Sequence, residues 1–236
     1  MPQQLLRSTF LAFALLSATA FAHGTVTISG VVYTFNTPFP VAGATVSIAE
    51  YPQISTTSDA AGHYTLSVPD DALVTPVASL PGYRTEYLQT FETDGDNIAN
   101  AHFQFIPEFI YQYLAAALGL DPNSPLCNIA STVSVAALHT ASWEELMAFG
   151  PQGETGATVT SHPALLGPIY FNEQTLPDPT LTSTTNDGGV LYVNVPPGVY
   201  RISAHHPDHR FAKMTVTCEP GRFINPSPSW GLWEKR

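Results

Sequence analysis

Three histidines lie close together near the C-terminal end of the 236-residue sequence, at His205, His206 and His209. Imidazole nitrogens are common ligands of zinc and copper. Neighbouring side chains on a β-strand point to opposite faces, so His205 and His206 would not reach one ion together. His206 and His209 flank the turn signal Pro207-Asp208 and could meet. The spacing therefore predicts a metal pair at His206 and His209, with a solvent-exposed turn as the alternative.

His23 is a second candidate metal ligand, because it follows a predicted signal peptide at residues 1–22. Arg7 supplies the initial positive charge, residues 10–16 form an apolar stretch too short to cross a bilayer, and Ala20-Phe21-Ala22 fits the A-x-A cleavage pattern. Cleavage there would free the amine of His23, which could chelate copper together with its imidazole. Cleavage two residues earlier would remove that option. A further histidine would have to complete such a histidine brace, and the candidates are His63, His102 and His139.

Glu92, Asp94 and Asp96 alternate in a loop that contains glycine. Carboxylate oxygens at this spacing suit calcium, although they miss the EF-hand register and lack its distal glutamate. A solvated acidic loop is the alternative. The sequence contains no G-x-S-x-G motif, so it does not predict a serine hydrolase. The candidate sites are therefore all metal sites, for copper, zinc or calcium, and no catalytic residue is assigned.

Charge is distributed unevenly along the chain. Residues 23–200 contain sixteen acidic residues and one basic residue, Arg84, whereas residues 201–236 contain six basic and three acidic residues. An acidic body repels nucleic acid and anionic membranes, so neither is an expected partner. No segment after the leader is long and apolar enough for a transmembrane helix. We therefore expect a soluble exported protein, either secreted or periplasmic.

Cys127 and Cys218 are the two cysteines of the sequence. Two cysteines in an exported chain most often pair, and two buried free thiols are the alternative. A bond between them would close a loop of about ninety residues, which the chain-entropy model values at about 4 kcal/mol. The cysteines bracket the second half of the chain, so the bond would join its first and last strands.

Turn signals and β-rich runs dominate the sequence, and proline and glycine far outnumber lysine. The clearest unit is residues 184–210. Asp187-Gly188-Gly189 predicts a reversal because glycine reaches positive φ without a Cβ clash. The β-rich run 190–195 follows, and Pro196-Pro197-Gly198 ends it. A weaker copy of this unit lies at residues 56–84.

Three short matches recur in the same order in both halves of the chain, which indicates an internal repeat. The matched segments are 43–46 with 156–159, 56–59 with 184–187, and 81–84 with 207–210. Between the halves, residues 107–120 place apolar side chains at helical spacing. We therefore predict two domains, 23–106 and 126–236, joined by a helix and linker at 107–125.

The C-terminal segment 219–236 contains three prolines and is predicted to be irregular or polyproline-like. Its aromatic residues Phe223, Trp230 and Trp233 indicate either a platform for stacking on sugars or packing over an open sheet edge. The basic residues of this region could dock on the acidic body or remain solvated.

Together these motifs resemble the carboxypeptidase regulatory-like, or transthyretin-like, β-sandwich. They read GATVSI, TTSDAAGHYTLSVP and SLPGYR in the first half, and GATVTS, TTNDGGVLYVNVPPGVY and HHPDHR in the second. The second half departs from the pattern through an inserted helix at residues 142–149, where Ser142 and Glu145 fit a capping box. The resemblance covers about two thirds of the chain after the leader.

The resemblance implies an all-β fold of two tandem antiparallel transthyretin-like or immunoglobulin-like β-sandwiches with a short linking helix. It also implies an exported, non-catalytic binding or structural module that acts on a protein or carbohydrate partner. That family brings no fixed catalytic residues. The rival hypothesis is a copper-dependent oxidative enzyme that uses His23 as the histidine brace.

Overall fold

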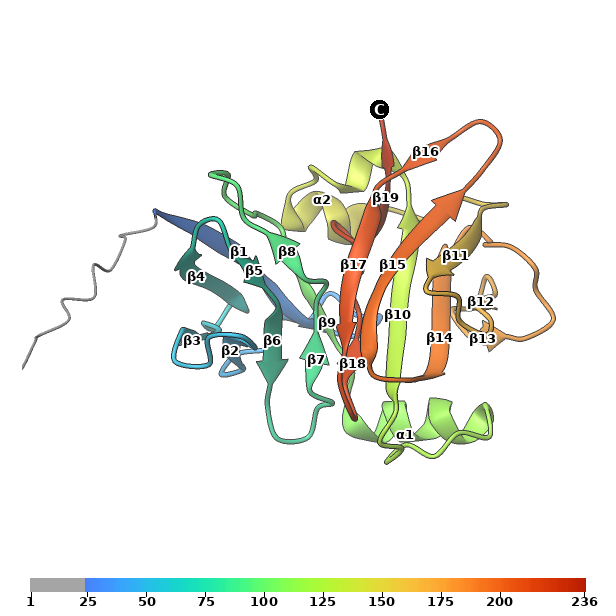
Figure 1. Cartoon of the computed structure of the whole chain (residues 1–236), viewed down its shortest axis with the longest axis horizontal. Helices are drawn as coiled ribbons and strands as arrows, with labels where there is room; N and C mark the ends of the chain where they lie inside the picture. Colours follow the sequence, from blue (N-terminus) through green and yellow to red (C-terminus); the bar gives the residue numbers. More distant parts are fainter. Residues whose placement is uncertain (1–23) are drawn as a thin grey trace, which may run out of the picture.

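The computed structural model describes residues 24–236, and strands dominate it (Figure 1). The predicted signal peptide at residues 1–22 and the candidate ligand His23 lie outside the described residues. Within the part that is described, none of the helices has the length and apolar character needed to cross a membrane.

The first half of the chain forms two small sheets that pack face to face. One has the order β4-β1-β9, and in the other β2 pairs with β3 and β6, and β6 pairs with β7. A further pair, β5 with β8, lies at one end. The strands are β1 (Thr25–Thr34), β2 (Thr45–Ile48), β3 (Ser55–Thr57), β4 (His63–Pro69), β5 (Leu73–Val74), β6 (Pro76–Ser79), β7 (Glu86–Tyr87), β8 (Phe91–Glu92) and β9 (Phe103–Phe105).

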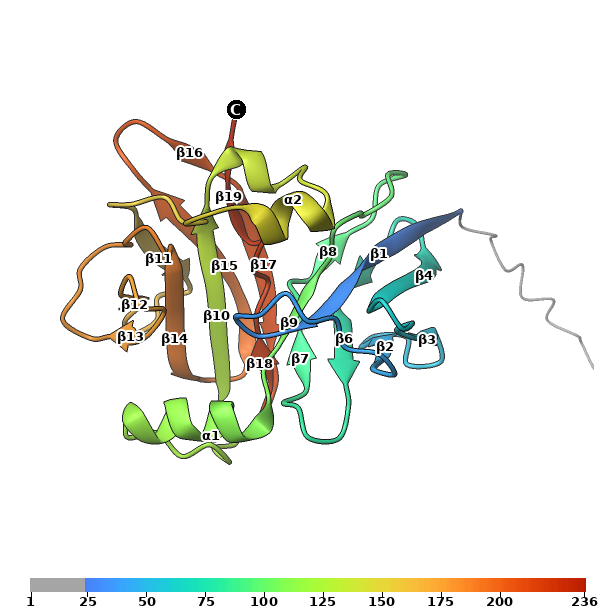
Figure 2. The same cartoon turned by 180° about the vertical axis from the view of Figure 1, so that it is seen from behind.

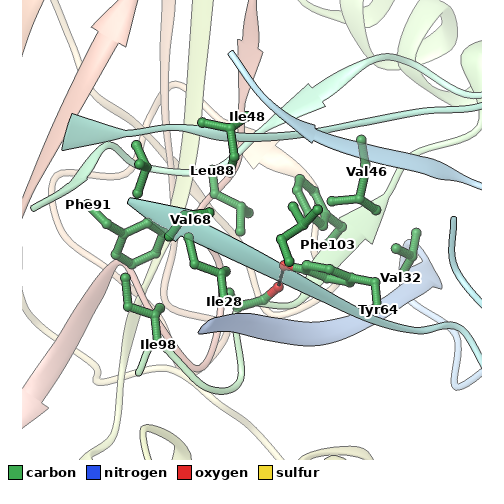
Figure 3. Packing of buried hydrophobic residues seen from close by; sticks show 14 of the residues in the cluster. Ile28, Val32, Val46, Ile48, Tyr64, Val68, Leu88, Phe91, Ile98 and Phe103 are labelled. Atoms are coloured by element: carbon green, nitrogen blue, oxygen red, sulfur yellow. Dashed lines mark hydrogen bonds between the residues drawn. The ribbon is translucent and has the colours of Figure 1, made fainter. Parts of the chain in front are cut away.

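Alternating side chains of these strands fill the first core. In β4, every second residue is buried, which places Tyr64, Leu66 and Val68 between the sheets. Figure 3 shows Tyr64 and Val68 packed with residues from both layers. The other labelled members of this core are Ile28, Val32, Val46, Ile48, Leu88, Phe91, Ile98 and Phe103.

The second half repeats this arrangement after helix α1 (Glu108–Ala117), which follows the predicted Pro107 start. The first strand of this half, β10, pairs antiparallel with β14 and parallel with β18 and β19. A second sheet has the order β11-β15-β17. The elements are β10 (Cys127–Ser134), a 3-10 turn (Ala136–Leu138), α2 (Trp143–Ala148), β11 (Thr158–His162), β12 (Ile169–Phe171), β13 (Pro177–Asp178), β14 (Gly189–Val195), β15 (Gly198–His205), β16 (Arg210–Phe211), β17 (Lys213–Cys218), β18 (Phe223–Ile224) and β19 (Leu232–Lys235).

The same local hydrogen bonds recur in both halves. The Ala44 amide donates to the Ser58 hydroxyl at 3.0 Å, and the Ala157 amide donates to the Thr184 hydroxyl at 2.9 Å. In each pair, the backbone amide of the later residue, Ser58 or Thr184, donates a hydrogen bond to the carbonyl oxygen of the alanine. Ser58 therefore corresponds to Thr184, which shifts the repeat by two residues from the alignment of 56–59 with 184–187.

Two equivalent glycines complete the repeat. Gly62 and Gly188 both adopt φ of 76°, a conformation that disfavours other residues. A Cβ at Gly62 would lie 2.5 Å from the Val32 oxygen, and one at Gly188 would lie 2.6 Å from the Val133 oxygen. The predicted all-β fold of two tandem β-sandwiches is confirmed, and each copy uses glycine where a turn passes close to its first strand.

The prediction of an irregular C-terminal segment is wrong for two short strands, β18 and β19, and the rest of residues 219–236 has no helix or strand. Strand β18 inserts between β10 and β7 and pairs parallel with both, so one sheet has the order β13-β12-β14-β10-β18-β7-β6-β2-β3. Figures 1 and 2 show the sheets β4-β1-β9 and β11-β15-β17 on opposite faces of this shared sheet. Residues 223–229 are all buried. The prolines suggested a loop, but the paired strand is only two residues long and lies between Pro220 and Pro226.

The aromatic residues of this segment pack within the protein. Trp230 meets the Phe91 ring edge-on at 5.0 Å and donates its indole N–H to the Ala99 oxygen at 2.8 Å. Trp233 stacks on the His139 ring at 3.7 Å. These contacts support packing over the sheet rather than a free sugar-binding platform.

The inserted helix α2 also connects the two halves. Its predicted capping box is present, with the Glu145 amide donating to the Ser142 hydroxyl and the Ser142 amide donating to the Glu145 carboxylate. Trp143 of this helix packs on Tyr33 of β1 with ring centres 4.8 Å apart. The helix therefore braces one sandwich against the other.

The predicted disulfide between Cys127 and Cys218 is confirmed, with Cα atoms 5.6 Å apart. Cys127 begins β10 in the shared sheet, and Cys218 ends β17 in the sheet that packs on it. The bond therefore joins the two layers of the second sandwich, from its first strand to β17 and not to its last strand as predicted.

We expect replacement of both cysteines by alanine to lower the free energy of unfolding by about 4 kcal/mol, because the bond restricts a loop of 91 residues in the unfolded chain. Urea unfolding of the variant and the unchanged protein measures this difference. An unchanged unfolding midpoint would contradict a stabilising role for the bond.

Candidate functional site

A groove lies over the outer face of β10 and β14, on the side away from the second core. Side chains alternate along β10, so Ile129 and Val133 enter the core while Ala130 and Thr132 face the groove. Leu191 and Val193 of β14 also line it. The floor of the groove is therefore mainly apolar.

Elements from distant parts of the chain close the groove. Figure 2 shows α1 across one end of β10 and β14, and α2 beside the other end of β10. Helix α1 presents Leu114 and Leu118, the first sandwich presents Phe35 and Ile106, and the C-terminal segment presents Phe223. The part of the groove lined by these residues has a volume of about 130 Å³. A more polar part beside α2 has a volume of about 370 Å³.

Six amide side chains are among the polar residues that line the groove. The side chain of Asn128 is already hydrogen-bonded within the protein, because it donates to the Tyr111 hydroxyl and accepts from the Asn194 backbone amide. Within residues 24–236, the side chains of Asn36 and Gln104 form no hydrogen bond. Since an amide both donates and accepts, these two side chains can pair with a neutral polar ligand group. The full set is Asn36, Gln104, Asn128, Gln152, Asn186 and Asn225.

Glu86 lies behind the groove at the join between the sandwiches. It stands opposite Phe223 in the pairing of β7 with β18, and its side chain is completely buried. Neither carboxyl oxygen has a hydrogen-bond partner in the described chain. Burial raises the pKa of this carboxyl well above its usual value, and the nearby Asn225 side chain and Gln104 backbone counteract this only in part. The buried position of Glu86 therefore favours the neutral, protonated form of its carboxyl group.

The structure brings His206 and His209 together, with ring centres 4.7 Å apart. His206 Nδ1 accepts from the Asp208 amide at 3.1 Å. His205 turns away and bonds the Thr160 hydroxyl at 2.9 Å. The pair is thus adjacent as predicted, but the strongest contacts of His209 are with other residues.

His209 lies between two glutamates that the sequence analysis did not identify. Its Nδ1 is 2.5 Å from Glu234 Oε1, and its Nε2 is 3.5 Å from Glu154 Oε1. The hydrogen bond with Glu234 raises the pKa of His209, and it lowers the pKa of Glu234. These glutamates come from distant segments, so no local motif could have revealed them.

The other histidines considered for a copper site lie away from the start of the described chain. His63 pairs with Val31, six residues along β1 from Thr25, a distance of about 20 Å in a strand. His102 accepts from the Val31 amide, and its burial lowers its pKa to about 4. His139 Nδ1 bonds the Ser229 oxygen at 3.0 Å. A copper site that includes His23 stays a prediction.

The predicted calcium ligands Glu92, Asp94 and Asp96 are exposed. In residues 24–236, the one group of three potential ligands whose atoms come within 4.8 Å of one another is elsewhere. Asn97 of this loop instead accepts from the Thr27 amide through its side-chain oxygen. The structure therefore gives the loop a role in holding β1, and calcium binding stays a prediction.

Comparison with known proteins gives little information on function. No family model and no curated protein matches the chain. Among solved structures, the minor pilin GBS52 of Streptococcus agalactiae is similar at 8% identity and a TM-score of 0.29, over 89% of this chain and 97% of that one. The Bacillus anthracis TIE protein is similar at 12% identity and a TM-score of 0.28, over 88% and 34%.

A cohesin–dockerin complex from Acetivibrio cellulolyticus contains a chain similar at 22% identity and a TM-score of 0.27. The match covers 32% of this chain and 52% of that one, so only about half of that chain is spanned. These scores are low, and neither the fold nor the function described here rests on them.

We expect Glu86→Gln to stabilise the protein above the usual carboxyl pKa. The unfolded wild-type chain releases its Glu86 proton at lower pH than the folded chain. The wild-type free energy of unfolding should therefore fall with rising pH, by about 1.4 kcal/mol per pH unit until the folded pKa is reached.

The glutamine variant lacks this dependence, so its advantage should grow as the pH rises above the usual carboxyl pKa and should vanish below it. Urea unfolding at several pH values tests this expectation. Parallel pH profiles for the two proteins would contradict the neutral state of Glu86.

Proposed function

We propose that this protein is an exported, non-catalytic binding module of the carboxypeptidase regulatory-like type, and that its groove binds an apolar peptide segment of a protein partner. The observation that carries the proposal is the groove over β10 and β14, which combines an apolar floor with amide side chains free to bond. Concave apolar sites with a few polar groups are the usual form of binding sites.

The lining of the groove favours a peptide over a carbohydrate. Leu114, Leu118 and Leu191 offer aliphatic surface suited to apolar side chains, and Asn36 and Gln104 offer the donor and acceptor that a peptide backbone needs. The two tryptophans of the C-terminal segment are engaged in internal contacts. A carbohydrate partner would therefore lack the aromatic platform that the sequence analysis considered.

Two features support export and a neutral or basic partner. The disulfide fits an oxidising compartment. The formal net charge of −11 favours partners that are not themselves acidic. Asp187 also lines the groove, which is consistent with a ligand that carries no negative charge there.

The experiment selects binders from a random peptide library against the full protein and measures their affinity by calorimetry. We expect the peptides to be rich in apolar residues. Leu191→Glu should weaken their binding at least tenfold, because a charge would replace an apolar contact worth about 1.5–3 kcal/mol.

Leu166→Glu is the matched control, since Leu166 is 95% exposed and does not line the groove. It should leave the affinity unchanged. A peptide whose binding is insensitive to Leu191→Glu would place the site elsewhere, and binders found only on a glycan array would refute the peptide proposal.

A further inference from the structure

We propose that Glu154, His209 and Glu234 form a zinc site that fastens the last strand of the chain to the second sandwich. The three side chains come from the loop before β11, the turn between β15 and β16, and β19. One possible ligand atom from each side chain lies within 4.8 Å of the other two, so the fold already brings these three ligands close together.

The donor atoms match zinc chemistry. An imidazole with two carboxylates is a ligand set found in zinc sites, in which three protein ligands leave a fourth position for water. Ligand atoms around a tetrahedral zinc ion lie about 3.3 Å apart, so small side-chain rotations must widen the 2.5 Å contact between His209 and Glu234 and bring Glu154 into range. Calcium and magnesium prefer sites made only of oxygen atoms, so the imidazole selects against them.

The charge of the cluster favours a cation. In residues 24–236, neither Glu154 nor Glu234 forms an ion pair with a lysine or arginine. Two carboxylates face one imidazole, so the three groups carry net negative charge whether or not His209 is protonated. Asp208 adds further negative potential, and Arg236 beside Glu234 offsets part of it.

A backbone hydrogen bond orients Glu234. Glu234 Oε2 accepts from the Ala136 amide at 3.2 Å, which leaves Oε1 directed at His209. Such bonds to the second carboxylate oxygen are typical of ligands oriented for a metal. The side chains of Glu154, His209 and Glu234 are 19%, 32% and 22% exposed, so an ion can enter from solvent.

His206 is adjacent but is not assigned as a ligand. Its Nδ1 accepts from the Asp208 amide, which leaves the proton of the neutral ring on Nε2. A ring nitrogen that carries a proton does not bind metal. This differs from the sequence-based pair of His206 with His209 and gives the test a matched control.

Zinc at this position would stabilise the C-terminal segment. Strand β19 pairs with β16 and with β10, and Glu234 lies opposite Phe211 in the first of these pairings. An ion that joins Glu234 to Glu154 and His209 therefore ties β19 to two further segments. Binding replaces any proton held by His209, which is released to solvent while zinc takes its place.

The test titrates zinc chloride into the full protein after removal of metal with a chelator. We expect one zinc ion per chain, with the stoichiometry and affinity measured from the heat of binding. At zinc concentrations about 100 times the dissociation constant, Tm should rise by about 5–10 °C. Calcium and magnesium at the same concentration should leave Tm unchanged.

Glu234→Gln and Glu154→Gln should each weaken zinc binding at least tenfold, and His209→Ala should abolish it. His206→Ala and Glu219→Gln should retain it. Because Glu154 lies outside the paired strands, Glu154→Gln keeps the test decisive if Glu234→Gln fails to fold. Absence of binding, binding that survives His209→Ala, or binding lost in His206→Ala would each overturn the proposal.

Discussion

The structure depends on the insertion of β18 between β10 and β7. A buried backbone amide or carbonyl needs a hydrogen-bond partner, and a strand without a neighbour leaves a row of them open. The Asn128 amide bonds the Arg222 oxygen, and the Asn225 amide bonds the Tyr87 oxygen. One short segment thus satisfies an edge of each sandwich and turns two sheets into one.

The shape of the groove and the burial of Glu86 both depend on the insertion of β18. The shared sheet places the outer face of β10 beside the first sandwich, so Phe35 and Ile106 can wall a surface that belongs to the second. Glu86 becomes fully buried because β18 lies alongside it. A binding surface built this way exists only while the two sandwiches stay joined, which links recognition to the folding of the C-terminal segment.

Local patterns predicted much of the fold. The turn at Asp187-Gly188-Gly189, the capping box of α2 and the disulfide all depend on residues whose chemistry is visible in the sequence. The path of β18 was not predictable in this way, because its pairing is parallel and reaches from residue 223 back to residue 86. Glu154 and Glu234 were missed for the same reason, since their approach to His209 depends on the pairing of β19 with β16 and β10.

Hydrogen exchange at the Asn225 amide tests the central role of β18 most directly. Exchange of a backbone amide reports the free energy of the opening that exposes it. If β18 joins the sandwiches, Asn225 should exchange only through global unfolding, at the same free energy as amides in the centre of β1 and β10. Exchange at the rate of an open loop, with β1 and β10 still protected, would show that the two sandwiches fold without this strand.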